Sequence, residues 1–176
     1  MIKITEIETP LGKMVAGATG EGICLLEFAD RNDLNEIYAD LSSVHATAVR
    51  AGLNWNLWKL RKQLREYFTG KRKDFTLKLL TAGTGFQKSV WEGLRKIPYG
   101  ETISYQDQAA GLKNTGAARA VAQANASNRI AIIIPCHRVI GADGSLVGYG
   151  GGLARKKWLL DHERKHSGKA IELDLF

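Results

Sequence analysis

The first 28 residues alternate short apolar stretches with turn signals, a pattern that is typical of β-strands. The alternation of isoleucines with polar residues at the start is imperfect, and the Thr-Pro-Leu-Gly sequence of residues 9–12 marks a turn. The apolar residues 15–18 and 23–28 flank a loop that contains two glycines, which predicts a hairpin. Residues 75–80 predict one further strand.

A helix is predicted after these first strands. Apolar residues recur every three or four positions over residues 54–68, lysines and arginines lie between them, and Gly70 is placed to end the helix. Residues 31–52 carry only a weak pattern of helix and loop. A stretch of small residues then interrupts the chain, so we place a boundary between an α/β domain of residues 1–82 and a second domain of residues 83–176.

The second domain is predicted to be mainly helical. Capping boxes at Thr84 and at Ser104 begin two helices, of which the second is short. Asn114 is placed to cap a third helix. The turn of about four residues at 111–114 matches the spacing of a helix-turn-helix, although any helical hairpin shows this spacing.

The predicted third helix consists almost wholly of small residues. Residues 117–126 read AARAVAQANA, and Arg119 is the single charge. Small side chains let a helix lie close to another surface, but they equally fit tight packing inside the protein. Arg119 is therefore either an ordinary solvated arginine or a side chain that projects from its small neighbours toward a partner.

The basic residues are concentrated after residue 48. Residues 1–48 hold three basic and eight acidic side chains, whereas residues 49–176 hold 22 basic and 10 acidic ones, and the net charge of the chain is +7. A basic region favours a polyanionic partner, with nucleic acid first and a membrane surface second. Solubility alone is an equally good explanation of the charge.

The composition excludes several classes of protein. With 44% hydrophobic and 24% charged residues, the chain is neither disordered nor collagen-like. Its longest apolar run, residues 130–134, is far too short to span a membrane, and no secretory signal is evident. We expect the two cysteines, Cys24 and Cys136, to be free thiols, and the lack of a CxxC pair argues against a cysteine zinc site.

The strongest local feature is a cysteine that follows a β-branched run. Pro135 is expected to end a strand immediately before Cys136, and His137 and Arg138 follow as basic neighbours that favour the thiolate. The alternative is a buried core cysteine beside unrelated polar residues. Because adjacent residues of a strand point to opposite faces, contact between His137 and Cys136 requires a bend or a bridging water.

The sequence Pro-Cys-His-Arg at 135–138, followed by Val-Ile-Gly, resembles the active-site signature of the O6-alkylguanine-DNA alkyltransferases, also called methylated-DNA–protein-cysteine methyltransferases. Further motifs of this family occur in order and at its spacing: Phe86-Gln87 with Val90-Trp91, residues 97–102, Ser104-Tyr105, residues 117–121, Gly148-Tyr149, and residues 157–160 with His162-Glu163. The resemblance is strong over residues 84–165 and looser over the first half, where residues 9–12 carry it.

The resemblance implies a function in DNA repair. A member of this family moves an alkyl group from the O6 atom of a flipped-out guanine to its own cysteine, irreversibly and once per molecule; O4-alkylthymine is a further candidate substrate. The implied fold is an α/β N-terminal domain with a ribonuclease-H-like sheet and a mainly helical C-terminal domain with a winged helix-turn-helix. No cofactor, metal or membrane is implied, and we expect a monomer that binds double-stranded DNA inside the cell, in the cytoplasm of a prokaryote or the nucleus of a eukaryote.

The resemblance also assigns roles to individual residues. Cys136 accepts the alkyl group, His137 is the base through a water, Glu163 polarises His137, and Asn128 supports the site. Tyr105 rotates the 3′ phosphate and protonates the leaving guanine. Arg119 replaces the flipped base in the stack, which gives the alanine-rich helix a purpose in the minor groove. The other expected DNA contacts are Tyr105, Gln106, Asn114, Thr115, Ala118 and Ala120. The expected pocket residues are Ala131, Pro135, Val139, Tyr149 and Gly150, with the carbonyls of Cys136 and Val139 reading the guanine amino group.

Two positions depart from the family pattern. Gly150 and Ala131 stand where several relatives carry a larger residue and a proline, which leaves the acceptance of bulky alkyl groups such as benzyl open. Cys24 is expected in the core, and His45, His162 and His166 on the surface. Two rival functions remain: a module that binds alkylated DNA without reacting, against which Cys136 argues, and a Cys-His hydrolase, for which no oxyanion hole can be placed.

Overall fold

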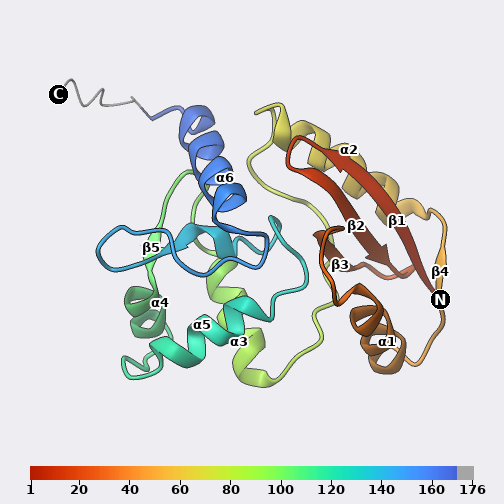
Figure 1. The fold of residues 1–176 in the computed structure, drawn as a ribbon, viewed down its shortest axis with the longest axis horizontal. Helices are drawn as coiled ribbons and strands as arrows, with labels where there is room; N and C mark the ends of the chain where they lie inside the picture. The colour runs from red at the N-terminus through yellow and green to blue at the C-terminus, as the bar shows by residue number, and fades with distance from the viewer. Residues whose placement is uncertain (170–176) are drawn as a thin grey trace.

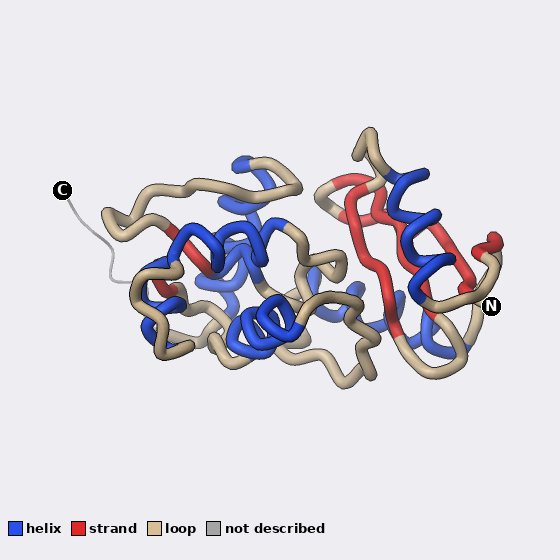
Figure 2. Tube along the Cα trace, turned by 90° about the horizontal axis from the view of Figure 1, so that it is seen from below, coloured by secondary structure: helices blue, strands red, loops and turns tan. Residues whose placement is uncertain are grey.

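In the computed structural model, which describes residues 1–169, a four-stranded sheet lies at one end of the molecule and most of the helices lie at the other (Figures 1 and 2). The sheet end is built from the first half of the chain and the helical end from the second half. This confirms the predicted division into an N-terminal sheet region and a mainly helical C-terminal region. Within residues 1–169, no helix is both long and apolar enough to cross a membrane.

The sheet has the strand order β3-β2-β1-β4. Its elements and the two helices of this half are β1 (Ile2–Thr9), β2 (Gly12–Ala18), β3 (Ile23–Phe28), α1 (Leu34–Val44), β4 (Val49–Ala51) and α2 (Trp55–Phe68). The first three strands pair antiparallel, as the turn and hairpin signals predict, while β4 pairs parallel with β1. The sequence did not predict β4, because three residues are too few to carry a periodic signal.

Helices cover both faces of the sheet. On one face Met14 and Leu26 pack in the same core as Leu60 of α2, and on the other face Ile2 packs in a core with Ile37 of α1. The imperfect alternation at the start of the chain follows from this arrangement, because both faces of β1 need apolar residues. The α2 helix matches the predicted range of residues 54–68, except that Asn54 caps the helix: its side chain accepts a hydrogen bond from the Leu57 amide.

The helical half holds five further helical segments and a two-stranded sheet. They are α3 (Gly85–Arg95), β5 (Ile103–Ser104), α4 (Tyr105–Gly111), α5 (Ala118–Ala126), the 3₁₀ turn η1 (Cys136–Arg138), β6 (Val139–Ile140) and α6 (Leu153–His166). Both predicted capping boxes are present, at Thr84 and at Ser104, because each depends only on residues three positions apart.

Three predicted features are wrong. Residues 75–80 form no strand, and only Leu79 bridges to Ile23 at the edge of the sheet. Asn114 does not cap α5, which begins after Ala117 without a side-chain cap. The connection from α4 to α5 therefore spans residues 112–117 and is longer than predicted, because Lys113 turns back with a positive φ before the next helix starts.

The third error concerns the apolar run before Cys136, which is a buried turn and not a strand. Ile132 has a φ of 71°, and the Ile134 amide bonds back to the carbonyl of Ile130. Only Ile130 pairs with the sheet, at Leu26 of β3. The β-branched residues of this run are buried without being extended, and their turn joins the helical half to the N-terminal sheet within one core.

Candidate active site

Cys136 is the first residue of η1 and is half-buried. Its Sγ atom lies 3.5 Å from Nδ2 of Asn128, which approaches as a donor. The Asn128 side chain is itself fixed, because Nδ2 also donates to the Ile134 carbonyl at 2.9 Å and Oδ1 accepts from the Ile130 amide at 2.9 Å. The structure thus brings together the expected nucleophile and its expected support.

The thiol of Cys136 is protonated at rest. Burial raises its pKa to about 11, and the hydrogen bond from Asn128 only partly opposes this effect. A thiol is a poor nucleophile in this state, since the thiolate is the reactive form. For this thiol to act as a nucleophile, a base would have to remove its proton.

His137 follows Cys136 in η1 and is held by a carboxylate. The ring is fully buried, and its Nε2 lies 2.8 Å from Oε1 of Glu163. An ionised carboxylate can only accept hydrogen bonds, so Nε2 carries the hydrogen and Nδ1 keeps its lone pair. Nδ1 is buried without a hydrogen-bond partner among residues 1–169. Burial also lowers the pKa of His137, so the ring is neutral and free to accept a proton.

Glu163 on α6 is the centre of a buried hydrogen-bond network. Arg138 donates to it from Nε at 2.8 Å and from Nη2 at 3.0 Å, the Tyr67 hydroxyl donates at 2.8 Å, and the Gly100 amide donates at 3.3 Å. Burial alone would raise the pKa of Glu163, but His137 and Arg138 outweigh it and hold this pKa well below its ordinary value. The carboxylate is therefore ionised and fixes the orientation of His137.

The sequence did not predict the roles of two members of this network. Arg138 was interpreted as a neighbour that favours the thiolate, but its guanidinium instead binds Glu163 and the Ile97 carbonyl. Tyr67 was seen only as part of a helix, yet it is fully buried and reaches Glu163 from the N-terminal half. Its one sequence signal is a hydroxyl-bearing side chain on the apolar face of α2.

Lys156 is a third residue that the sequence did not single out. Its side chain is buried, and Nζ donates to the carbonyl of Val139 at 2.5 Å and to that of Val147 at 2.8 Å. Tyr105 donates its hydroxyl hydrogen to the Val147 and Gly148 carbonyls at 3.1 and 3.2 Å. Lys156 and Tyr105 together therefore hold the loop that carries Tyr149 against the active site.

Cys136 lines two cavities. The larger, of about 230 Å³, is also lined by Tyr105, Ala122, Asn125, Ala126, Gly148, Tyr149 and Gly150. The smaller, of about 20 Å³, is bordered by Ala131, Asn128, Tyr149 and Gly150 and by residues of β3 and the segment after it. Of the expected pocket residues, Val139 is fully buried and lines neither cavity, and Pro135 faces a different recess beside Phe75 and Arg95.

The residues expected to contact DNA lie on α4, α5 and the connection between them. Arg119, Ala120, Gln106, Asn114 and Thr115 are exposed, and Ala118 is half-buried. The two helices are locked together by a buried pair of amides: Gln108 donates to Asn125 at 3.0 Å and accepts from it at 2.8 Å. Sequence reasoning missed this pair, although it fixes the angle at which α5 is presented.

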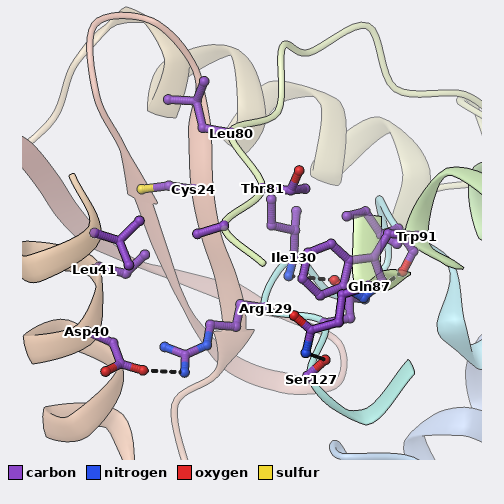
Figure 3. Close-up of a pocket in the computed structure, with 14 residues that line it drawn as sticks. Cys24, Asp40, Leu41, Leu80, Thr81, Gln87, Trp91, Ser127, Arg129 and Ile130 are labelled. Carbon is purple, nitrogen blue, oxygen red and sulfur yellow. Dashed lines mark hydrogen bonds and ion pairs between the residues drawn. The ribbon is translucent and has the colours of Figure 1, made fainter. Parts of the chain in front are cut away.

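A further cavity of about 160 Å³, which Cys136 does not line, lies between the two halves of the molecule (Figure 3). Arg129 pairs with Asp40 of α1 at its border at 2.7 Å, and Gln87 donates to Ser127 on the other side at 3.2 Å. Cys24 lines it and is buried, as predicted. The Arg129–Asp40 pair ties the two halves together, whereas Gln87 and Ser127 both belong to the C-terminal half.

The prediction that His162 lies on the surface is wrong. Its ring is buried, stacks on Trp158 with centroids 4.8 Å apart, and contacts the Tyr67 carbonyl through Nε2 at 2.8 Å. The reason is that α6 turns this side toward the end of α2. His45 and His166 are half-buried. Among residues 1–169, no cluster of three or more His, Cys, Asp or Glu side chains could hold a metal ion.

Comparison with known proteins agrees with this geometry over nearly the whole chain. Residues 85–165 match the model of the 6-O-methylguanine DNA methyltransferase DNA binding domain, and residues 2–81 match that of the ribonuclease-like domain of the same proteins. A methylated-DNA–protein-cysteine methyltransferase of Methanosarcina barkeri is 43% identical over 160 residues, which cover 91% of this chain and 96% of the relative.

Solved structures show the same similarity. The O6-methylguanine methyltransferase of Mycobacterium tuberculosis superposes with a TM-score of 0.81 at 37% identity, covering 100% of this chain and 99% of that one. The Mycobacterium tuberculosis OGT in complex with DNA gives a TM-score of 0.78 at 38% identity, covering 94% and 93%. The chain belongs to the 6-O-methylguanine DNA methyltransferase family.

Proposed function

We propose that this protein repairs DNA by moving an alkyl group from the O6 atom of guanine to Cys136. The observation that carries the proposal is the half-buried Cys136, which lines a cavity. The next residue in the sequence is the neutral His137, and its Nε2 atom is held by the ionised Glu163. The relatives of this chain are named for such a transfer to cysteine, and a similar structure is a complex with DNA.

The residues of the site support a direct displacement. Nδ1 of His137 takes the Cys136 proton through a water, and Glu163 stabilises the imidazolium that forms. The sulfur then attacks the alkyl carbon, so that an S–C bond forms while the C–O6 bond breaks and its electron pair stays on the guanine. Tyr105, whose pKa is raised by burial, remains protonated at neutral pH and supplies a proton to the leaving base. The thioether does not revert, so each molecule reacts once and needs no cofactor.

The exposed side of α4 and α5 is the surface that we assign to DNA. The alanines beside Arg119 allow α5 to approach the minor groove, and the arginine fills the space left by the flipped base. Tyr105, Gln106, Asn114 and Thr115 would contact the backbone, which positions the protein without reading sequence. We further propose that β5 and β6 belong to a winged helix-turn-helix and that the N-terminal sheet is ribonuclease-H-like. The boundary between the two domains would then lie between residues 82 and 83. The protein acts as a monomer inside the cell.

The function is tested with duplex DNA that carries a labelled methyl group on the O6 atom of one guanine. We expect the label to move to the protein, to reach one equivalent and to stop there. Retention of the DNA without transfer would instead identify a binding module, and neither retention nor transfer would leave a hydrolase as the better explanation.

Arg119→Ala is expected to slow repair of duplex DNA by about tenfold or more while changing the reaction with free O6-methylguanine base little, because the wedge is needed only to hold a base out of the stack. Transfer rates are measured on both substrates. Arg164→Ala, which removes an exposed arginine from α6, is the matched control for loss of positive charge. Equal slowing on both substrates by Arg119→Ala would contradict the wedge role.

A further inference from the structure

A buried acidic side chain from the N-terminal sheet reaches the site of the reactive cysteine. Glu27 lies on β3, a strand whose other residues are all apolar or cysteine and all buried. Its side chain is only 5% exposed. A carboxyl group is costly to bury, so its place in this strand calls for a reason beyond packing.

Arg31 is the partner that keeps Glu27 in place. Its Nη1 lies 3.4 Å from Oε2 of Glu27, but its shorter contacts go to Asp33, at 2.8 Å from Nε and 2.7 Å from Nη2. The Arg31 guanidinium thus stays paired even without Glu27. Burial raises the pKa of Glu27 to about 7, and Arg31 only partly opposes this. Glu27 is therefore a weakly satisfied carboxyl group that retains hydrogen-bonding capacity.

Glu27 lines the smaller of the two cavities at Cys136. Phe28, Arg31, Ala131, Tyr149 and Gly150 line the same cavity. Its volume of about 20 Å³ suits a group of roughly the size of one water. The Tyr149 hydroxyl is also buried without a hydrogen-bond partner among the described residues. The small cavity that Cys136 lines is therefore also lined by two residues, Glu27 and Tyr149, whose polar groups have hydrogen-bonding capacity left.

We propose that Glu27, held by Arg31, forms a polar wall for the alkyl group and makes this protein favour hydroxyl-bearing alkyl groups over apolar groups of the same size. This inference rests on the proposed transfer of an alkyl group to Cys136. A terminal hydroxyl can form a hydrogen bond with the Glu27 carboxyl whether that group is ionised or protonated. A terminal methyl group would displace water from the carboxyl and form no hydrogen bond in its place. A methyl group is short enough to leave the wall untouched.

The test compares duplex DNA containing O6-(2-hydroxyethyl)guanine with duplex DNA containing O6-propylguanine, two groups that differ only by OH in place of CH₃ at the end. O6-methylguanine is the reference substrate. Transfer to Cys136 is followed by the mass of the cysteine peptide against time. The ratio of the hydroxyethyl rate to the propyl rate is compared between proteins, so that the intrinsic reactivity of the two groups cancels.

Glu27→Leu is expected to lower this ratio about tenfold or more, since a hydrogen bond to a charged group is lost and an apolar contact is gained. Glu27→Gln, which keeps the shape and removes the charge, should lower it less. Glu21→Gln, an exposed glutamate in the loop before β3, should leave it unchanged. The methyl rate should stay within about threefold in all of them, which shows that each variant is folded.

An unchanged ratio in Glu27→Gln and Glu27→Leu, with methyl transfer intact, would overturn the polar wall while leaving the proposed function standing. Absence of methyl transfer in the unmodified protein would instead overturn the proposed function. If Glu27→Leu does not fold, the ratio in Glu27→Gln decides alone, because the amide oxygen of that variant can keep the contact with Nη1 of Arg31.

Discussion

The Cys136→Ser protein is expected to bind lesion-bearing duplex DNA as tightly as the unmodified protein and to accept no alkyl group. Serine has nearly the same shape as cysteine and can still accept the hydrogen bond from Asn128. Its hydroxyl, however, is far less acidic than a thiol and its oxygen is a harder atom than sulfur, so it does not become a soft nucleophile at neutral pH. Label transfer and an electrophoretic binding assay, run on the same DNA, measure the two properties separately.

Cys24→Ala is the matched control for loss of a thiol, because Cys24 is buried at the cavity between the two halves and faces no reactive group. It should transfer the alkyl group to one equivalent. Stoichiometric labelling of the Cys136→Ser protein at any other residue would show that the acceptor has been assigned wrongly.

Glu163→Gln is expected to lower both the transfer rate and the stability by large amounts. The amide leaves the buried Arg138 guanidinium without a counter-charge, which costs about 3–5 kcal/mol in the free energy of unfolding. It can also donate a hydrogen to Nε2 of His137 and so move the ring hydrogen to Nδ1, where the proton of Cys136 must arrive. Loss of a positioned base slows transfer about a hundredfold or more. Urea unfolding and single-turnover label transfer measure the two effects.

Tyr67→Phe separates these effects, because it removes one donor from Glu163 and leaves the carboxylate and Arg138 paired. We expect a loss of about 2 kcal/mol in stability and a much smaller loss of rate than in Glu163→Gln. If the two variants slow transfer equally when both are folded, Glu163 acts through packing alone and its role in holding His137 is refuted.

Local signals allowed much of the fold to be predicted from the sequence. The capping boxes at Thr84 and Ser104 depend on neighbours three residues away, and the structure has both. The apolar run before Cys136 was misread as a strand because β-branched residues suit both an extended chain and a buried turn, and only the sheet that packs against Ile130 decides between them. Asn114 has the right chemistry for a cap, but Lys113 turns the chain away first.

The candidate site was predictable where its residues are adjacent in sequence. Cys136, His137 and Arg138 lie in one short stretch, and the family resemblance added Asn128, Tyr105 and Glu163. The partners that come from the other half of the chain carry no such signal. Tyr67 meets Glu163 across 96 residues, and Glu27 reaches the cavity from the third strand. The spacing of apolar and polar residues does not reveal contacts between residues so far apart in the sequence, because only the folded chain brings them together.

The hydrogen bond from Tyr67 to Glu163 has a consequence for engineering. A truncated protein that begins after the small-residue break would keep the Pro-Cys-His-Arg sequence of residues 135–138, yet it would expose the Glu163 carboxylate to solvent and remove β3 from beneath the Ile130 turn. Such a fragment would display the reactive motif without its scaffold. Circular permutants should therefore have their new termini in a surface loop, and inserted tags should be placed in such a loop. Neither change should be made in the segment that joins the two halves.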